Sequence, residues 1–136
     1  EDKKEQPFVS ADYRVLVVDD NAINRKLAVA MLRVYGFQID EADGGKIAID
    51  KVKNTRYDLV FMDHMMPEMD GIEATRVIRS ECGDMADGTI IIALTANAIQ
   101  GAREMYLENG FDDFLSKPFD REKLNSLLRH WIPGME

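Results

Sequence analysis

The sequence predicts an α/β domain whose central parallel sheet is covered by helices on both faces. Short apolar runs alternate five times with segments that have helical periodicity. The runs at 15–18, 59–62 and 90–94 are apolar at every position, which is typical of strands buried on both faces. Strands that alternate with helices in this way pair in parallel through right-handed crossovers. These observations indicate one doubly wound sheet.

The order of the elements follows from apolar periodicity and from residues that favour helix ends and turns. Asn21 is suited to cap a helix, and Ile23, Leu27 and Met31 follow it at helical spacing until Gly36 ends the segment. In order, we expect a strand at 13–18, a helix between 21 and 36, a strand at 37–42, a short helix around 47–52, a strand at 59–63, a helix at 71–83, a polar loop at 83–88, a strand at 90–94, a helix from 95–97 to 110, a strand at 111–115 and a helix along 124–131.

Length and composition indicate one domain at 13–132, between a charged linker or tail at 1–12 and a short tail at 133–136. A formal charge of −8 disfavours binding to nucleic acid or to anionic membranes. The single Cys82 excludes an internal disulfide, and no apolar run is long enough to span a membrane, so we expect a cytoplasmic domain. Because only five residues follow Trp131, we expect any output domain upstream or on another chain.

Polar residues follow four of the predicted strands: Asp19 and Asp20, Asp63, Thr95, and Lys117. The carboxyl ends of parallel strands lie at one edge of a sheet, so these side chains should gather there. Neighbouring carboxylates repel one another unless they share a proton or bind a hard divalent cation such as Mg²⁺. A lysine and a hydroxyl suit phosphate, and a carboxylate can act as the nucleophile on phosphorus. The pattern therefore predicts Mg²⁺-dependent phosphoryl transfer.

Four segments carry a specific resemblance: 17–21, 62–71, 94–96 and 116–119. In their order and spacing they resemble the receiver (response-regulator) domain of two-component signalling, from about residue 13 to 131. The stretches 20–25 and 73–76 resemble the receivers of hybrid sensor histidine kinases and phosphorelays. The resemblance implies a flavodoxin-like (CheY-like) fold with five strands in the order 2-1-3-4-5 and five helices.

The resemblance also implies a metal site and a phosphorylation site. Asp63 would accept a phosphoryl group from a phosphohistidine. Asp20 and Asp63 would bind Mg²⁺ directly, together with the backbone carbonyl of Met65, and Asp19 would act through a metal-bound water.

Further residues are assigned by the same resemblance. Thr95 would donate a hydrogen bond to a phosphoryl oxygen, and Lys117 would pair with the phosphorylated carboxylate. Pro118 would follow a cis peptide bond that positions the lysine loop. Phe114 occupies the position of the switch aromatic, where tyrosine is the commoner residue.

Two side chains are expected to tune the lifetime of the phosphorylated form. In the family, the positions of Met65 and Asn97 flank the line along which water attacks the acyl phosphate. An apolar Met65 should hinder that water, which predicts a lifetime of minutes or longer. His64 and His130 are expected to be exposed bystanders.

The predicted partner is a histidine kinase or a histidine phosphotransfer domain that docks on residues 21–27, and the domain itself should be a monomer or a weak dimer. No metabolic activity is expected beyond self-phosphorylation and dephosphorylation. Alternatives are a stand-alone response regulator and a receiver-like scaffold that binds partners without phosphorylation. An aspartate-nucleophile phosphohydrolase is disfavoured because Asp19 and Asp20 are adjacent, and because no insertion is long enough for a substrate cap.

Overall fold

The structure, a computed structural model, describes residues 12–96 and 100–133. Five parallel strands form one sheet in the order β2-β1-β3-β4-β5, as predicted. Along the chain the elements are β1 (Arg14–Val18), α1 (Ala22–Arg33), β2 (Gln38–Ala42), α2 (Gly45–Asn54), β3 (Leu59–Asp63), α3 (Gly71–Glu81), the 3-10 helix η2 (Gly83–Ala86), β4 (Ile90–Thr95), α4 (Ala102–Glu108), β5 (Asp113–Ser116) and α5 (Arg121–Trp131).

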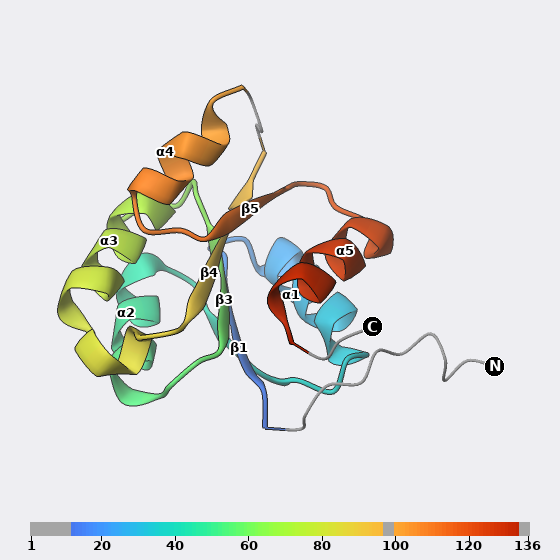
Figure 1. The fold of residues 1–136 in the computed structure, drawn as a ribbon, viewed down its shortest axis with the longest axis horizontal. Helices are drawn as coiled ribbons and strands as arrows, with labels where there is room; N and C mark the ends of the chain where they lie inside the picture. The colour runs from blue at the N-terminus through green and yellow to red at the C-terminus, as the bar shows by residue number, and fades with distance from the viewer. Residues whose placement is uncertain (1–11, 97–99, 134–136) are drawn as a thin grey trace.

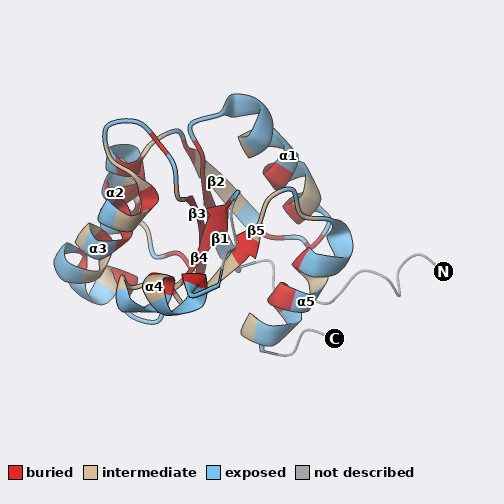
Figure 2. Cartoon of the chain, turned by 90° about the horizontal axis from the view of Figure 1, so that it is seen from above, coloured by how far each residue is buried: buried red, intermediate tan, exposed pale blue. Residues whose placement is uncertain are grey.

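The sheet separates two apolar cores. In β1, Leu16 and Val18 point into the core beneath α2, α3 and α4, whereas Val15 and Val17 point into the core beneath α1 and α5. Figure 1 shows these two groups of helices on opposite sides of the strands, and Figure 2 shows burial concentrated on the strands and on the inward faces of the helices. Alternation of side chains along each strand therefore supplies both cores.

Strand register brings the carboxyl ends of the central strands to one edge. Asp63, the last residue of β3, pairs with Leu94, and Thr95, the last residue of β4, pairs with Ser116. The amide of Lys117 continues this ladder by donating to the Thr95 carbonyl at 2.7 Å. The polar residues predicted to gather at one edge are thus placed there by ordinary parallel pairing.

The fourth helix is shorter than predicted. We expected it to begin at 95–97, but α4 begins at Ala102. Gly101 has a φ of +87°, a left-handed conformation that cannot continue a right-handed helix, so α4 starts only after it. The predicted polar loop at 83–88 also differs, because η2 occupies its first part and buries Ala86.

The apolar spacing that predicted α1 does not mark its buried face. Ile23 and Leu27 are 73% and 60% exposed. The core contacts come instead from Ala28, Val29 and Leu32. Two large apolar side chains of α1 therefore lie in solvent.

Within residues 12–96 and 100–133, no helix is long and apolar enough to cross a membrane.

Candidate functional site

Three carboxylates meet at the carboxyl edge of the sheet. Asp19 and Asp20 follow β1, and Asp63 ends β3; one oxygen from each lies within 4.8 Å of the others. Asp19 and Asp63 are 2% and 4% exposed, while Asp20 is exposed. The strands thus deliver two buried charges and one exposed charge to a common point, as predicted.

Lys117 provides the opposing charge from the loop after β5. Its Nζ lies 2.8 Å from Oδ1 of Asp63 and 3.8 Å from Oδ2 of Asp19. The peptide bond between Lys117 and Pro118 is cis, which is the geometry predicted for it. One lysine faces three carboxylates, so the cluster keeps an excess of negative charge.

The electrostatics of Asp63 reflect this imbalance. Burial raises its pKa, and the nearby charges of Asp19 and Asp20 raise it further. The hydrogen bond and charge of Lys117 lower the pKa but do not cancel these effects. An ionised Asp63 is therefore under-compensated by the protein alone.

The donor set fits Mg²⁺. All three side chains offer carboxylate oxygens, which are the hard ligands that Mg²⁺ prefers, and their separation suits a shared ion. Asp20 is exposed, which leaves room for the waters that Mg²⁺ retains. A divalent cation would also neutralise the excess charge of the cluster.

A glycine lets the next helix approach Asp63 closely. A Cβ atom at Gly71 would lie 2.2 Å from the carbonyl oxygen of Asp63. The Gly71 amide donates to the carbonyl of His64 at 2.8 Å, and Asp70 caps α3 through the amide of Glu73 at 2.9 Å. Any side chain at Gly71 would push α3 away from the end of β3.

Asp19 is held by contacts that the sequence analysis missed. Its Oδ1 accepts from the Asn21 amide at 2.9 Å, and its carbonyl accepts from Nη1 of Arg25 at 2.8 Å. Arg25 is in turn paired with Glu41 at 2.9 Å. No side-chain spacing in the sequence identifies this contact, because Asp19 precedes α1 and accepts the hydrogen bond through its backbone carbonyl.

The predicted switch residues lie on neighbouring strands. Thr95 ends β4 and is 5% exposed, and Phe114 is half-buried in β5. Phe114 stacks on Tyr106 of α4, with ring centroids 5.8 Å apart. The guanidinium of Arg103, also on α4, lies 5.4 Å from the centroid of the Phe114 ring. Phe114 therefore contacts two side chains of α4, those of Tyr106 and Arg103.

The prediction that His64 is an exposed bystander is wrong. Its side chain is partly buried, and Nδ1 lies 2.9 Å from the hydroxyl of Tyr106. The two rings also meet edge to face, with centroids 5.5 Å apart. A tyrosine on the inward face of a helix needs a partner for its hydroxyl, and His64 is that partner.

Other predictions have mixed outcomes. The side chain of Met65 is 71% exposed, and Asn97 lies outside the described residues, so their tuning roles and the Met65 carbonyl ligand stay predictions. His130 is exposed, as expected. Cys82 is buried, and burial raises the pKa of its thiol, which agrees with a structural role.

Comparison with known proteins identifies the family. The family model described as "Response regulator receiver domain" matches residues 15–129. The chain belongs to this family. The signal transduction histidine-protein kinase BarA of Escherichia coli is 38% identical over 120 residues, a match that covers 88% of the chain and 13% of BarA. The chain therefore corresponds to a small part of this longer relative. The predicted relationship to the receiver domains of histidine kinases is confirmed.

Solved structures agree with this assignment. The receiver domain of the sensor histidine kinase PA1611 from Pseudomonas aeruginosa has a TM-score of 0.79 and 40% identity, covers 89% of this chain and 98% of its own, and contains magnesium in its active-site cleft. The receiver domain of Ssk1 from Saccharomyces cerevisiae, solved with the histidine phosphotransfer protein Ypd1, has a TM-score of 0.78 and 30% identity, and covers 90% of each chain. The predicted receiver fold and signalling role are thus confirmed.

Proposed function

We propose that Asp63 is the phospho-acceptor of this receiver and takes a phosphoryl group from a phosphohistidine in a Mg²⁺-dependent reaction. The observation that carries the proposal is the contact of Asp63 with Lys117 at 2.8 Å inside the cluster formed with Asp19 and Asp20. The magnesium in the PA1611 receiver supports the same choice of metal. The domain that carries this activity spans residues 13–132.

The side chains divide the chemistry among them. An oxygen of Asp63 attacks phosphorus, the bond between phosphorus and the imidazole nitrogen breaks, and its electron pair returns to the ring. Lys117 then pairs with the new phosphoryl charge, and Thr95 donates a hydrogen bond to it. Asp19 and Asp20 would hold Mg²⁺ together with Asp63; when bound, the metal would offset charge on the phosphoryl oxygens.

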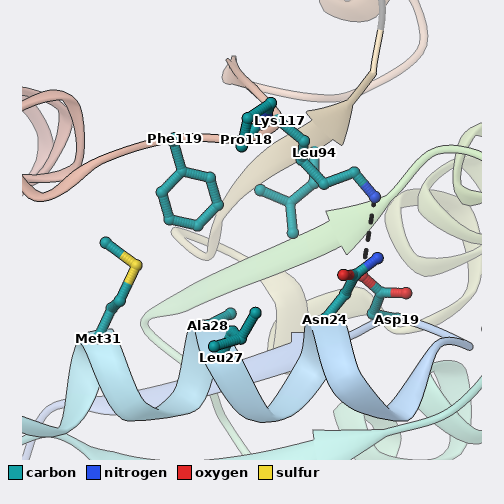
Figure 3. Close-up of a pocket in the computed structure, with 9 residues that line it drawn as sticks. All are labelled: Asp19, Asn24, Leu27, Ala28, Met31, Leu94, Lys117, Pro118 and Phe119. Carbon is teal, nitrogen blue, oxygen red and sulfur yellow. Dashed lines mark ion pairs between the residues drawn. The ribbon is translucent and has the colours of Figure 1, made fainter.

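We propose that the donor domain docks on α1 beside this site. A pocket of about 370 Å³ runs from the acidic cluster between α1 and the loop after β5. Figure 3 shows Leu27 and Met31 of α1 facing Phe119 across it, with Lys117 and Asp19 at one end. The exposed apolar side chains of α1 suit the apolar surface of a histidine phosphotransfer domain or kinase, and the Ssk1–Ypd1 complex supports a partner of this class.

We further propose that the chain acts as the cytoplasmic receiver of a hybrid sensor histidine kinase. The match of this chain to BarA supports this context, as do its matches to other proteins named histidine kinases. In that setting the receiver relays its phosphoryl group to a separate phosphotransfer domain, and phosphorylation moves the face formed by β4 and α4.

Phosphoryl uptake by Asp63→Asn tests the central assignment. The wild type should become labelled by a radioactive small-molecule phosphodonor in the presence of Mg²⁺, and the variant should show at least a hundredfold less label, because the amide is a poor nucleophile. Asp50→Asn, at an exposed position of α2, is the matched control and should label normally. Equal labelling of Asp63→Asn and the wild type would refute the assignment.

A further inference from the structure

The contact between His64 and Tyr106 connects the end of β3, where Asp63 is the proposed phosphorylation site, to helix α4. His64 follows Asp63 directly, and its backbone is fixed from both sides: its amide donates to the Leu94 carbonyl at 2.9 Å, and its carbonyl accepts from Gly71 at 2.8 Å. Its ring nitrogen Nδ1 lies 2.9 Å from the hydroxyl of Tyr106. A side chain anchored on the rigid end of β3 thus holds a side chain of α4.

Tyr106 is the principal anchor of α4. This helix is seven residues long, and its buried residues are Ala102 and Tyr106. The Tyr106 ring is 2% exposed and packs on three other rings: edge to face on His64 and Phe111, and stacked on Phe114. The position of this ring therefore determines where α4 lies against the sheet.

Tyr106 borders an open space beside Thr95 and also contacts Phe114. A pocket of about 330 Å³ lies there, and its lining includes His64, Thr95 and Tyr106. Phe114 does not line this pocket, but it stacks on the same Tyr106 ring with centroids 5.8 Å apart, and Arg103 lies over the Phe114 ring at 5.4 Å. An inward rotation of Phe114 towards Thr95 requires the Tyr106 ring to move, and such movement stretches or breaks its bond to His64.

We propose that the His64–Tyr106 hydrogen bond is a latch that holds α4 and Phe114 in the unphosphorylated arrangement. This inference rests on the proposed function of Asp63 and Thr95. His64 and Tyr106 are positioning residues, because neither contacts the transferred group. Phosphorylation must release the latch, so the latch sets how strongly the domain prefers its resting state.

Variants that weaken the latch should have a higher affinity for ligands that bind the active state. Tyr106→Phe removes the hydroxyl and keeps the ring, and His64→Leu removes the other partner. With Mg²⁺ present, each variant should bind the phosphoryl analogue beryllofluoride about two- to tenfold more tightly, the range expected for one hydrogen bond. The double variant should gain no more than either single variant, because both remove the same bond. His64→Asn, which places a polar atom near the position of Nδ1, should restore wild-type affinity.

The single tryptophan provides the readout. Nε1 of Trp131 donates to Asp113 at 2.8 Å, Asp113 pairs with Arg103 at 3.3 Å, and Arg103 covers Phe114. Movement of α4 should therefore change Trp131 fluorescence. Tyr57→Phe is the matched control: this tyrosine is 2% exposed and donates at 2.6 Å to Asp40 of β2, the strand at the opposite edge of the sheet from β5. It should lower stability without changing beryllofluoride affinity.

Hydrogen exchange in the absence of phosphoryl analogues separates this inference from the proposed function. Amides of α4 should exchange about two- to tenfold faster in Tyr106→Phe and His64→Leu than in the wild type, and those of α2 should be unchanged. If the wild type fails to bind beryllofluoride, the proposed function fails and exchange alone decides the latch. Unchanged α4 exchange in both variants, or additive effects on beryllofluoride affinity, would overturn the latch.

Discussion

Asp63 is a carboxylate whose surroundings favour its neutral form. It is buried beside Asp19 and within reach of Asp20, and Lys117 compensates only part of their repulsion. The protein therefore keeps Asp63 at a cost in stability, and that cost falls when a cation or a protonated state offsets the charge. A buried cluster of like charges of this kind lowers the stability of the folded protein.

Asp63→Asn should stabilise the metal-free protein at neutral pH by roughly 1 kcal/mol. Because the folded-state pKa of Asp63 is raised, the acid contributes stability below its unfolded value, and this contribution is lost as the pH rises through the folded pKa. The stability difference between variant and wild type should therefore grow from about pH 4 to about pH 7. Urea denaturation across this range measures it.

Mg²⁺ supplies the control for that experiment. At tenfold excess over its dissociation constant, a metal that binds the folded state adds about 1.4 kcal/mol of stability. The wild type should show this gain and Asp63→Asn should show much less of it. Equal stabilisation of the two proteins would place the metal away from Asp63.

At the scale of elements, α3 has an unusual buried hydroxyl. Thr75 is fully buried on its inward face, and its Oγ1 has no hydrogen-bond partner within the described ranges. Thr89 makes the contrast: it is also buried, but its Oγ1 donates to the carbonyl of Tyr57 at 2.7 Å. A buried threonine hydroxyl should therefore destabilise the fold at position 75, where it is unpaired, and stabilise it at position 89, where it is hydrogen-bonded.

Thr75→Val should raise the free energy of unfolding by about 1 kcal/mol, because it replaces an unpaired buried hydroxyl by a methyl group of similar size. Thr89→Val, the matched control, should lower it by about 1–2 kcal/mol because the Tyr57 carbonyl loses its donor. Thermal or urea denaturation compares them. Destabilisation by Thr75→Val would show that its hydroxyl is paired in solution.

At the scale of the whole molecule, the site and the exposed face of α1 are adjacent. The pocket in Figure 3 connects Leu27 on that face to Lys117 at the acidic cluster. A partner seated on α1 would therefore place its own reactive group close to Asp63. Among the large apolar side chains of residues 12–96 and 100–133, those of Ile23, Met65 and Leu27 are the most exposed.

Leu27→Glu should slow phosphoryl transfer from a phosphorylated histidine phosphotransfer domain at least tenfold, because it puts a charge into an apolar contact. Uptake from a small-molecule phosphodonor should be unchanged, since that reaction needs no docking surface. Ile47→Glu is the control: Ile47 is 47% exposed on α2, on the other side of the sheet. Equal slowing by both variants would argue against docking on α1.

Much of the fold could be predicted because it depends on local patterns. Apolar runs at β1, β3 and β4, and the caps Asn21 and Asp70, mark elements through side-chain periodicity and short-range hydrogen bonds. The start of α4 was predicted too early because a glycine's backbone conformation is not visible in the sequence: Gly101 adopts a positive φ only in the folded chain.

For this protein, the sequence by itself determined the acidic edge with Lys117, since this depends on which residue ends each strand. The family and the strand order followed from the resemblance of its motifs to receiver domains. The tertiary structure decided what depends on contacts between distant segments. Arg25 pairs with Glu41 across 16 positions of the chain, and His64 meets Tyr106 across 42. No local pattern encodes such pairs, because they form only when packing brings α1 and α4 against the ends of the strands.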